Sequence, residues 1–346
     1  MDRPKIGWFC TYTPIEIIEA AGLMPYGIRE NSGKAYEDVY LGDSVCSYVR
    51  SCLGGALSGA YDFLDGVVIA HSCECMRRLY DAWMFKQEEI KPKRVFFLDV
   101  PRVKSEPAIH FFAKQIERLK EEMEACYGEI SHTSLINAIN TSNRTRELIA
   151  RLNETRKKDY PPITGSEVAQ LIKKGMAAPG DSFNQELEEL LAGLNGRSGD
   201  MDRPRVLVYA GPAYGRLIES VEEAGGIVVC EHMCNGLRQF GKTVERDDDP
   251  ILELSRRYLE KPPCPRMIGE HSMEGLFELK RMVDEFKVDG IIYCSVKFCS
   301  NMQAGWPLFK EELQAGVPMK FLEGDMEAGI NEREVQSFIK KLARRR

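Results

Sequence analysis

Two distant stretches of this chain repeat one pattern, and this repetition restricts the fold more than any other feature. Residues 65–75 read DGVVIAHSCEC, and residues 289–299 read DGIIYCSVKFC. In each stretch an acidic residue and a glycine precede a short apolar run, with a cysteine just beyond it. Such a run between turn signals is typical of a buried parallel strand. Because open α/β sheets bind ligands at the carboxyl ends of their strands, we expect these cysteines at the ligand-binding edges of two related sheets.

The repeated pattern also divides the chain. A second strand-like run follows each stretch, at residues 94–100 and 318–324, and a Gly-rich linker occupies residues 193–204. The chain of 346 residues is longer than one ordinary domain. We therefore predict an α/β fold of two doubly wound, Rossmann-like domains with a helical connecting segment. The predicted units are a first α/β domain over residues 1–105, a helical segment and linker over 106–202, and a second α/β domain over 203–346.

Two helix starts are predicted close to cysteines. After Cys10, Thr13 is expected as an N-cap, with Pro14 at the first helical position and Glu16 closing a capping box. Asp43 or Ser44 is expected to cap a second helix that carries Cys46 in its first turn. A thiol there is exposed to the positive end of the helix dipole, which favours the thiolate form that binds metals.

Composition excludes several classes of function. The net charge is −6, and the only basic block is Arg344 to Arg346, so a nucleic-acid-binding surface is not expected. No apolar run approaches the roughly 20 residues that span a bilayer, and the amino terminus lacks a signal-peptide layout. We therefore expect a cytoplasmic protein with no membrane partner.

The chain holds eleven cysteines, and in a reducing compartment these point to metal ligation, thiol catalysis or burial rather than to disulfides. Cys52 and Cys126 lie on apolar helical stripes and are expected to pack in the core, whereas Cys230 and Cys294 end buried strands. Cys75 is the hardest to exclude as a ligand, because it lies two residues from Cys73. Six cysteines fall in predicted loops or first turns, three from each half: Cys10, Cys46, Cys73, Cys234, Cys264 and Cys299.

Three kinds of thiol chemistry can be compared on spacing. Cys230 and Cys234 have the spacing of a zinc knuckle, but no second knuckle follows at a usual distance. His71 and His232 are each close in sequence to a cysteine, yet nothing singles out one nucleophile. Iron–sulfur ligation needs several thiolates from separate turns, although the spacing here differs from the compact ferredoxin run. The chain has neither a phosphate loop of the G-x-x-x-x-G-K-[ST] type nor a dinucleotide-binding G-x-G-x-x-G.

Several motifs together resemble those of the 2-hydroxyacyl-CoA dehydratase and benzoyl-CoA reductase family, and the resemblance covers nearly the whole chain. The residues that carry it are GWFCTYTPIEII at 7–18, CSY at 46–48, CECMRRLY at 73–80, EHMCNGLR at 231–238 and KFC at 297–299. In the dehydratases three cysteines hold one [4Fe–4S] cluster, and these match Cys46, Cys73 and Cys299. With Cys10, Cys234 and Cys264 added, the set is similar to the double-cubane cluster branch, in which two [4Fe–4S] cubanes share a bridging sulfide.

The resemblance implies a division of labour. A separate ATP-hydrolysing activator with its own [4Fe–4S] cluster would supply low-potential electrons. This chain, expected as a homodimer, would then be the iron–sulfur oxidoreductase that reduces a small molecule at a double-cubane [8Fe-9S] cluster. His71 and His232 could deliver protons, or could simply be solvated loop side chains.

Two other functions stay open at this point. One is a 2-hydroxyacyl-CoA dehydratase subunit, a lyase with a single [4Fe–4S] cluster. The other is a cluster-storage or electron-relay protein without a substrate. No residue is a clear anchor for CoA, and the sequence does not name the substrate.

Overall fold

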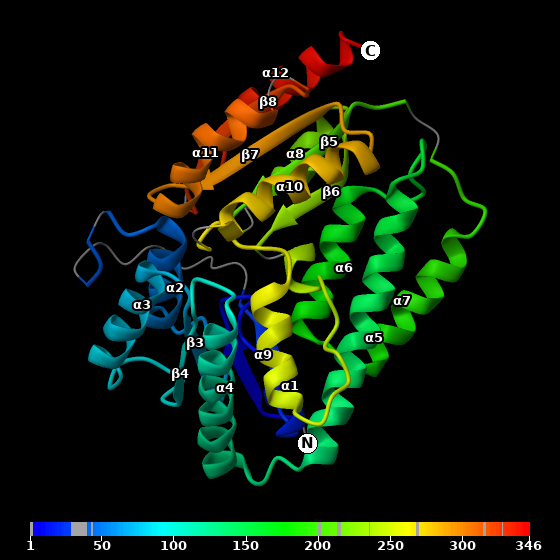
Figure 1. Cartoon of the computed structure of the whole chain (residues 1–346). Coiled ribbons are helices and arrows are strands. Elements are labelled where there is room, and N and C mark those ends of the chain that lie inside the picture. The colour runs from blue at the N-terminus through cyan, green and yellow to red at the C-terminus, as the bar shows by residue number, and fades with distance from the viewer. Residues whose placement is uncertain are drawn as a thin grey trace.

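The computed structural model describes residues 3–28, 40–42, 44–199, 202–212, 216–234, 236–267, 270–313, 316–326 and 328–346. It contains two four-stranded sheets in which all paired strands are parallel (Figure 1). The first sheet has the order β2-β1-β3-β4 and the second the equivalent order β6-β5-β7-β8. The strands are β1 (Lys5–Trp8), β2 (Met24–Gly27), β3 (Gly66–His71), β4 (Val95–Asp99), β5 (Arg205–Ala210), β6 (Ile227–Met233), β7 (Gly290–Val296) and β8 (Met319–Gly324). The predicted fold class of two doubly wound α/β units is therefore confirmed.

The repeated acidic residue and glycine before β3 and β7 have a structural role. The carboxylate of Asp65 accepts a hydrogen bond of 2.8 Å from the amide of Lys5, and the carboxylate of Asp289 accepts one of 2.7 Å from the amide of Arg205. Each aspartate thus fixes the start of the central strand beside it. The glycine after Asp289 has no room for a side chain, because a β-carbon there would lie 2.5 Å from Leu342.

Helices cover both sheets, and apolar packing continues from one half to the other. The first half contributes α1 (Ile15–Ala20), α2 (Ser47–Leu57) and α3 (Glu74–Phe85). The second contributes α8 (Leu217–Glu223), the 3₁₀ turn η1 (Leu237–Gln239), α9 (Pro250–Glu260), α10 (Glu270–Glu285), α11 (Ser300–Leu313) and α12 (Glu332–Ala343). One buried apolar cluster includes Val67 and Ile69 of β3 together with Val208 of β5 and Ile292 of β7. The two sheets therefore share part of their core.

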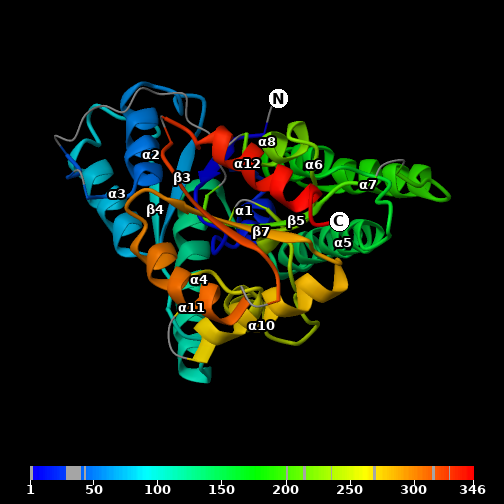
Figure 2. The same cartoon turned by 90° about the horizontal axis from the view of Figure 1, so that it is seen from above.

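The predicted helical connecting segment is present as four helices. They are α4 (Glu106–Tyr127), α5 (His132–Arg156), α6 (Gly165–Ala177) and α7 (Asp181–Leu194). Figure 2 shows α5, α6 and α7 extending to one side of the molecule, opposite α2 and α3. Helix α6 contacts the edge strands β2 and β6 of both sheets, so this segment bridges the two halves.

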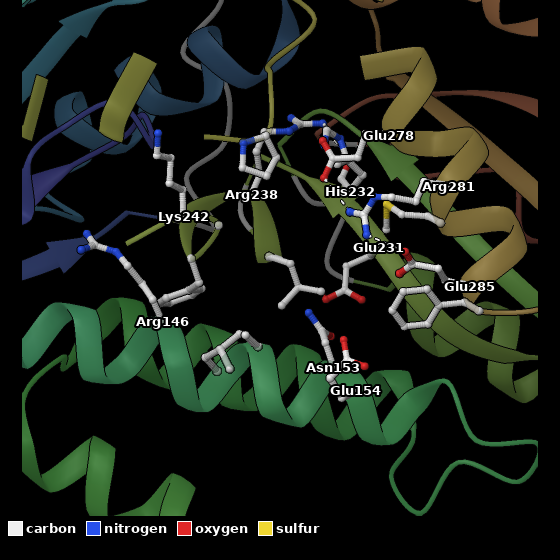
Figure 3. A pocket seen from close by; sticks show the side chains of 18 of the residues that line it. Arg146, Asn153, Glu154, Glu231, His232, Arg238, Lys242, Glu278, Arg281 and Glu285 are labelled. Carbon is white, nitrogen blue, oxygen red and sulfur yellow. Dashed lines mark hydrogen bonds and ion pairs between the residues drawn. The ribbon is translucent and has the colours of Figure 1, made fainter. Parts of the chain in front are cut away.

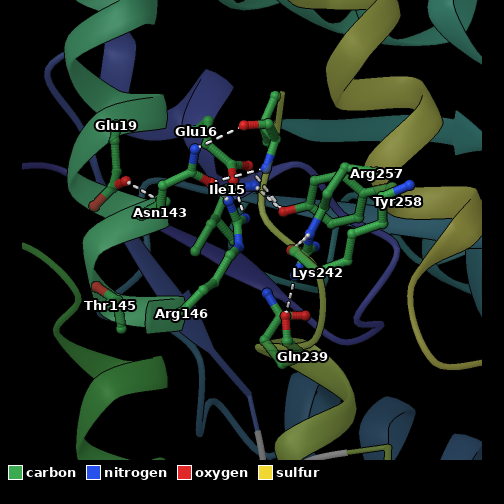
Figure 4. A network of polar contacts seen from close by, with 12 residues as sticks. Ile15, Glu16, Glu19, Asn143, Thr145, Arg146, Gln239, Lys242, Arg257 and Tyr258 are labelled. Atoms are coloured by element: carbon green, nitrogen blue, oxygen red, sulfur yellow. Dashed lines mark hydrogen bonds and ion pairs between the residues drawn. The ribbon is translucent and has the colours of Figure 1, made fainter. Parts of the chain in front are cut away.

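Helix α9 belongs to the second half in sequence but packs against α4 of the connecting segment (Figure 1). It also contacts α1, because the hydroxyl of Tyr258 donates to the carboxylate of Glu16 at 2.8 Å, and Glu16 also forms an ion pair with Arg146 of α5 (Figure 4). The predicted capping box at Thr13 is therefore wrong. Helix α1 begins at Ile15 without a side-chain cap, because the Glu16 carboxylate turns into the core to neutralise a buried guanidinium.

Four cysteines predicted to be buried differ in outcome. Cys52, Cys230 and Cys294 are buried as expected. Cys126 is exposed, and the prediction that it packs in the core is wrong. It lies in the last turn of α4, beyond the buried stripe that ends at Met123. Periodicity identifies the apolar face of a helix, but it does not tell how far along that face a neighbour covers it.

Two further observations concern the predicted boundaries. The expected cap Asp43 lies outside the described residues, and α2 begins at Ser47, so that Cys46 occupies the N-cap rather than the first turn. Within the described part of the chain, no helix combines the length and apolarity that crossing a bilayer requires.

Candidate metal centre

The six cysteines singled out by sequence line a single cavity between the carboxyl edges of the two sheets. The cavity encloses about 710 Å³ of empty space, its open mouth included. Its described lining residues are Phe9, Cys10, Thr11, Cys46, Tyr48, Val49, Ser72, Cys73, Met76, Gly211, Pro212, Cys234, Cys264, Pro265, Arg266, Val296, Cys299, Asn301 and Met302. The five other cysteines of the chain are absent from this lining. The fold thus collects thiols from six separate turns, three from each half.

Three of these cysteines occupy equivalent positions at the starts of helices. Cys46 and Cys73 are the N-caps of α2 and α3, and Cys299 directly precedes α11. In each case the backbone amide three residues further on lies near the cysteine sulfur and acts to lower its pKa; these amides belong to Val49, Met76 and Met302. Helix amino termini carry unpaired amides and roughly half a positive charge. We call Cys46, Cys73 and Cys299 the N-cap trio.

Of the other three cysteines, Cys234 and Cys264 lie beside arginine side chains instead. The Nη1 atom of Arg238 donates to the Sγ atom of Cys234 at 3.0 Å, and Arg266 follows Cys264 by two residues and lines the cavity. The thiols of Cys234 and Cys264 are hydrogen-bonded to each other. Cys10, which follows β1, acts electrostatically on Cys234 and also on Cys73 of the N-cap trio. We call Cys10, Cys234 and Cys264 the arginine trio.

The two arginines beside this trio are almost completely buried, Arg238 at 1% exposure and Arg266 at 2%. Arg238 also donates to the carbonyl and the Nδ1 atom of His232, and Arg266 donates to the carbonyl of Pro101 at 2.8 Å. Among the described residues neither arginine forms an ion pair with a carboxylate. Buried charges are normally paired, so this site has two buried cations that no carboxylate contacts directly.

A third buried basic side chain, Lys261, lies close to the same trio at 1% exposure. Its side-chain nitrogen donates to the carbonyl of Thr11, next to Cys10. Burial, followed by the charge of Arg257, lowers the pKa of Lys261 well below its ordinary value. A negative charge in the cavity would favour the protonated form of this side chain, whereas the arginines keep their charge in any case.

The cavity thiols differ in the direction of their pKa shifts. Burial raises the pKa of Cys73 to about 12 and that of Cys299 to about 11. The hydrogen bond from Cys234 lowers the pKa of Cys264 to about 5, and Arg238 and Arg266 act in the same direction. Thiols with a raised pKa keep their protons, so metal binding at this cavity must release protons.

Cys75 does not line the cavity, but its thiol is hydrogen-bonded to that of Cys46. This contact raises the pKa of Cys46 and lowers that of Cys75 to about 6. Cys75 therefore lies behind the N-cap trio as a hydrogen-bond partner of one of its members.

The two histidines predicted as proton donors lie outside the cavity lining. His71, half-buried at the end of β3, contacts Asp99 at 2.9 Å through its Nδ1 atom. His232 is buried and lines a neighbouring cavity between α5 and α10, where its Nε2 atom lies 3.4 Å from Glu278 (Figure 3). Burial and the adjacent Arg238 lower the pKa of His232. Since arginine can only donate, Nδ1 of His232 accepts, and the imidazole is neutral with its proton on Nε2.

A groove beside α11 borders the cysteine cavity. It is lined by the aromatic side chains of Tyr209, Tyr293 and Phe309 and by small residues that include Gly275 and Gly305. We call it the α11 groove. It shares three lining residues with the cavity: Cys264, Pro265 and Asn301. Cys264 belongs to the arginine trio, and Asn301 lies two residues after Cys299 of the N-cap trio, so the groove borders the cavity near both trios.

Comparison with known proteins identifies the family. The sequence model described as 2-hydroxyglutaryl-CoA dehydratase, D-component, matches residues 10–341 and so includes all six cavity cysteines. The chain belongs to this dehydratase family. Its relatives include a benzoyl-CoA reductase subunit from Thauera aromatica, 25% identical over 86% of this chain and 79% of the relative. The (R)-phenyllactyl-CoA dehydratase beta subunit of Clostridium sporogenes is 24% identical over 94% of this chain and 87% of its own.

A third relative, the beta subunit of (R)-2-hydroxyglutaryl-CoA dehydratase from Acidaminococcus fermentans, is 22% identical over 90% of this chain and 84% of its own. Membership of the dehydratase family supports an enzymatic role for this chain, as a dehydratase or a reductase. The resemblance inferred from the sequence motifs is thereby confirmed.

The sequence analysis did not identify the buried basic side chains beside the cysteines. Arg238 lies inside one of the family motifs, and its place four residues after Cys234 was the signal that could have found it. Lys261 and Arg266 flank the stretch Pro262–Pro265, and nothing in their local pattern distinguishes them from surface residues. Their burial depends on α9 crossing to the first half, which is a tertiary property.

Proposed function

We propose that this chain is the reductase component of a two-component system and binds a double-cubane [8Fe-9S] cluster through Cys10, Cys46, Cys73, Cys234, Cys264 and Cys299. One observation carries the proposal. All six cysteines selected by their predicted loop positions line one cavity, and the five excluded ones do not. A random distribution of buried thiols over two domains would not produce that separation.

The donor set suits a cluster better than a single ion. Structural zinc needs four ligands around one ion, about 2.3 Å from each sulfur. Among the described residues no group of three Cys, His, Asp or Glu side chains is placed to hold one metal ion. In an iron–sulfur cluster each thiolate binds a different iron, so the ligands stand further apart around a shared inorganic core.

The surroundings of the thiols also suit a cluster. A thiolate-bound cluster brings negative charge into an apolar cavity, and the buried Arg238 and Arg266 offer positive charge that no carboxylate contacts directly. Hydrogen bonds to ligand sulfur are a recognised means of tuning iron–sulfur potentials, and backbone amides at helix starts lie near the three sulfurs of the N-cap trio. Because each cubane needs three thiolates, we assign one trio to each cubane. Each cubane would then be bound by cysteines from both halves.

Electrons would come from a separate activator that hydrolyses ATP, since this sequence has no phosphate loop. In each transfer the activator loses one electron and this chain gains it. Such a cluster supplies low-potential electrons. The α11 groove beside the cavity would be the binding site of a small molecule, and the chain would act as a cytoplasmic homodimer.

A second candidate is a 2-hydroxyacyl-CoA dehydratase subunit with a single [4Fe–4S] cluster. The N-cap trio favours it, because these three cysteines share one geometry and could bind a cubane without the others. That reaction removes water and needs no net reduction. It leaves Cys10, Cys234 and Cys264 without iron.

Iron and acid-labile sulfide analysis of anaerobically purified protein separates the two. We expect about eight irons per chain in the parent and a marked loss in Cys10→Ala, Cys264→Ala and Cys46→Ala. Cys52→Ala, a buried cysteine outside the cavity, is the matched control and should keep its iron. About four irons, insensitive to Cys10→Ala and Cys264→Ala, would reject the double cubane in favour of the dehydratase.

A further inference from the structure

The two trios lie in different electrostatic surroundings. The N-cap trio faces backbone amides and the amino termini of α2, α3 and α11. The arginine trio faces two full charges, Arg238 and Arg266, which stay protonated at every accessible pH. Among the described residues that line the cavity, Arg266 is the one side chain with a permanent charge.

We propose that Arg238 and Arg266 give the two cubanes different reduction potentials, so that the first electron reduces the cubane bound by the arginine trio. The inference rests on the proposed double cubane. In the transfer the reduced activator loses one electron and that cubane gains it; no bond forms or breaks.

Three contacts support the direction of the bias. Nη1 of Arg238 donates to Sγ of Cys234 at 3.0 Å, which disperses charge that reduction adds to this sulfur. Arg266 is held at the cavity wall because its guanidinium also donates to the carbonyl of Pro101 and stacks 4.1 Å from the ring centroid of Tyr12. Both arginines are at most 2% exposed, so solvent screens them little.

The helix termini at the N-cap trio stabilise an added electron less than the arginines do. Each amounts to roughly half a charge, which is matched by the opposite charge at the far end of the same helix, and the effect is confined to the first turn. A guanidinium carries a full charge with no opposite charge in the same group. Nearby positive charge raises a cluster's reduction potential, so the arginine trio should hold the more easily reduced cubane.

This bias has a functional consequence. The α11 groove borders the cavity at Cys264 and Pro265, and at Asn301 two residues after Cys299. Cys264 is a ligand of the cubane that would hold the first electron, so that electron would lie beside the groove.

An EPR-monitored redox titration of the holoprotein tests the inference. The parent should titrate in two one-electron steps. Arg266→Gln should make the first reduction at least tenfold less favourable, which lowers its potential by 59 mV or more for one electron. The potential of the second reduction should shift less. Arg266→Lys, which keeps the charge, should restore most of the difference.

The matched control is Lys297→Gln. Lys297 lies two residues before Cys299, as Arg266 lies two residues after Cys264, but its side chain is 45% exposed, so both steps should stay in place. Arg238→Gln provides an independent second test, with iron measured on every variant. If the parent holds about eight irons and the arginine variants shift both steps equally, only the second step, or neither, the inference is overturned while the double cubane stands. About four irons in the parent would overturn both.

Discussion

The hydroxyl of Tyr258 on α9 donates a hydrogen bond of 2.8 Å to the carboxylate of Glu16 on α1, and this contact joins the two halves of the chain (Figure 4). Helix α1 follows the turn that carries Cys10, and α9 leads into the loop that carries Cys264. The contact therefore helps to hold together the two segments that carry these members of the arginine trio. Glu16 also neutralises Arg146, which is 3% exposed, so three elements converge on one buried carboxylate.

Removing that carboxylate should destabilise the fold strongly. Glu16→Ala leaves the guanidinium of Arg146 buried without its partner, and we expect a loss of about 3 to 5 kcal/mol in the free energy of unfolding. Tyr258→Phe removes only a hydrogen bond to a charged group and should cost about 1.5 to 3 kcal/mol. Urea denaturation of the iron-free chain measures both.

The control for this prediction is Glu147→Ala. Glu147 pairs at 3.5 Å with Arg144 on the exposed face of α5, and such surface pairs contribute about 0 to 1 kcal/mol. If Glu16→Ala cost no more than Glu147→Ala, the buried network would not hold α1 and α9 together.

Glu19, one turn after Glu16, should make stability depend on pH near neutrality. Burial and then the charge of Glu16 raise the pKa of Glu19 to about 7. Its ordinary value is about 4.3, so the folded state binds the extra proton between these two values. The stability that this proton contributes is complete below about pH 4.3 and is lost as the pH rises through about 7.

Glu19→Gln should therefore stabilise the chain at pH 8 and leave it nearly unchanged at pH 5. We expect about 1 to 2 kcal/mol at pH 8, less than the pKa difference implies, because the side chain is partly exposed. Unfolding free energies measured at the two pH values test this expectation. An equal effect at both would show that Glu19 titrates normally.

The sequence predicted the cysteines of the site better than the buried side chains that surround them. The aspartate and glycine before Val67 and Ile291 revealed both sheets, because the strand start they build is local. Loop positions separated the six cavity cysteines from the buried ones, because strand ends and helix starts are also local. The prediction for Cys126 failed because coverage of a helix end depends on its neighbours.

The capping box predicted at Glu16 also failed because of contacts with distant parts of the chain. Thr13 and Glu16 have the spacing of a capping box, and local sequence alone favours that interpretation. Arg146 and Tyr258, both distant in the chain, offer the carboxylate a charge and a hydroxyl in the core, and these contacts outweigh a cap worth about 1 kcal/mol. The burial of Lys261 and Arg266 could not be predicted for the same reason.

The two candidate proton donors should behave differently. His71 contacts Asp99 and is half-buried, so His71→Ala should lower turnover while leaving iron content and EPR spectrum unchanged. His232 is neutral and holds Arg238, so His232→Ala should act through Arg238 and alter the EPR spectrum. Turnover with the reduced activator, recorded beside the spectra, distinguishes them. Full turnover in both variants across the working pH range would remove both from the list of proton donors.

Losing the cluster should loosen the loops of the cavity without separating the two halves. Metal binding and the ordering of its ligand loops are thermodynamically coupled, so those loops should open more often in the iron-free chain. Other contacts across the halves do not involve the cysteines: the amide of Ser47 donates to the carbonyl of Lys297 at 3.3 Å, and Arg266 donates to Pro101. We expect hydrogen exchange after iron removal to rise at residues 46–49 and 264–267 and to stay slow in β3 and β7. Cys46→Ala and Cys264→Ala, from different halves, should each reproduce the pattern at both loops. Faster exchange at the mutated loop alone would show that the two trios bind separate clusters.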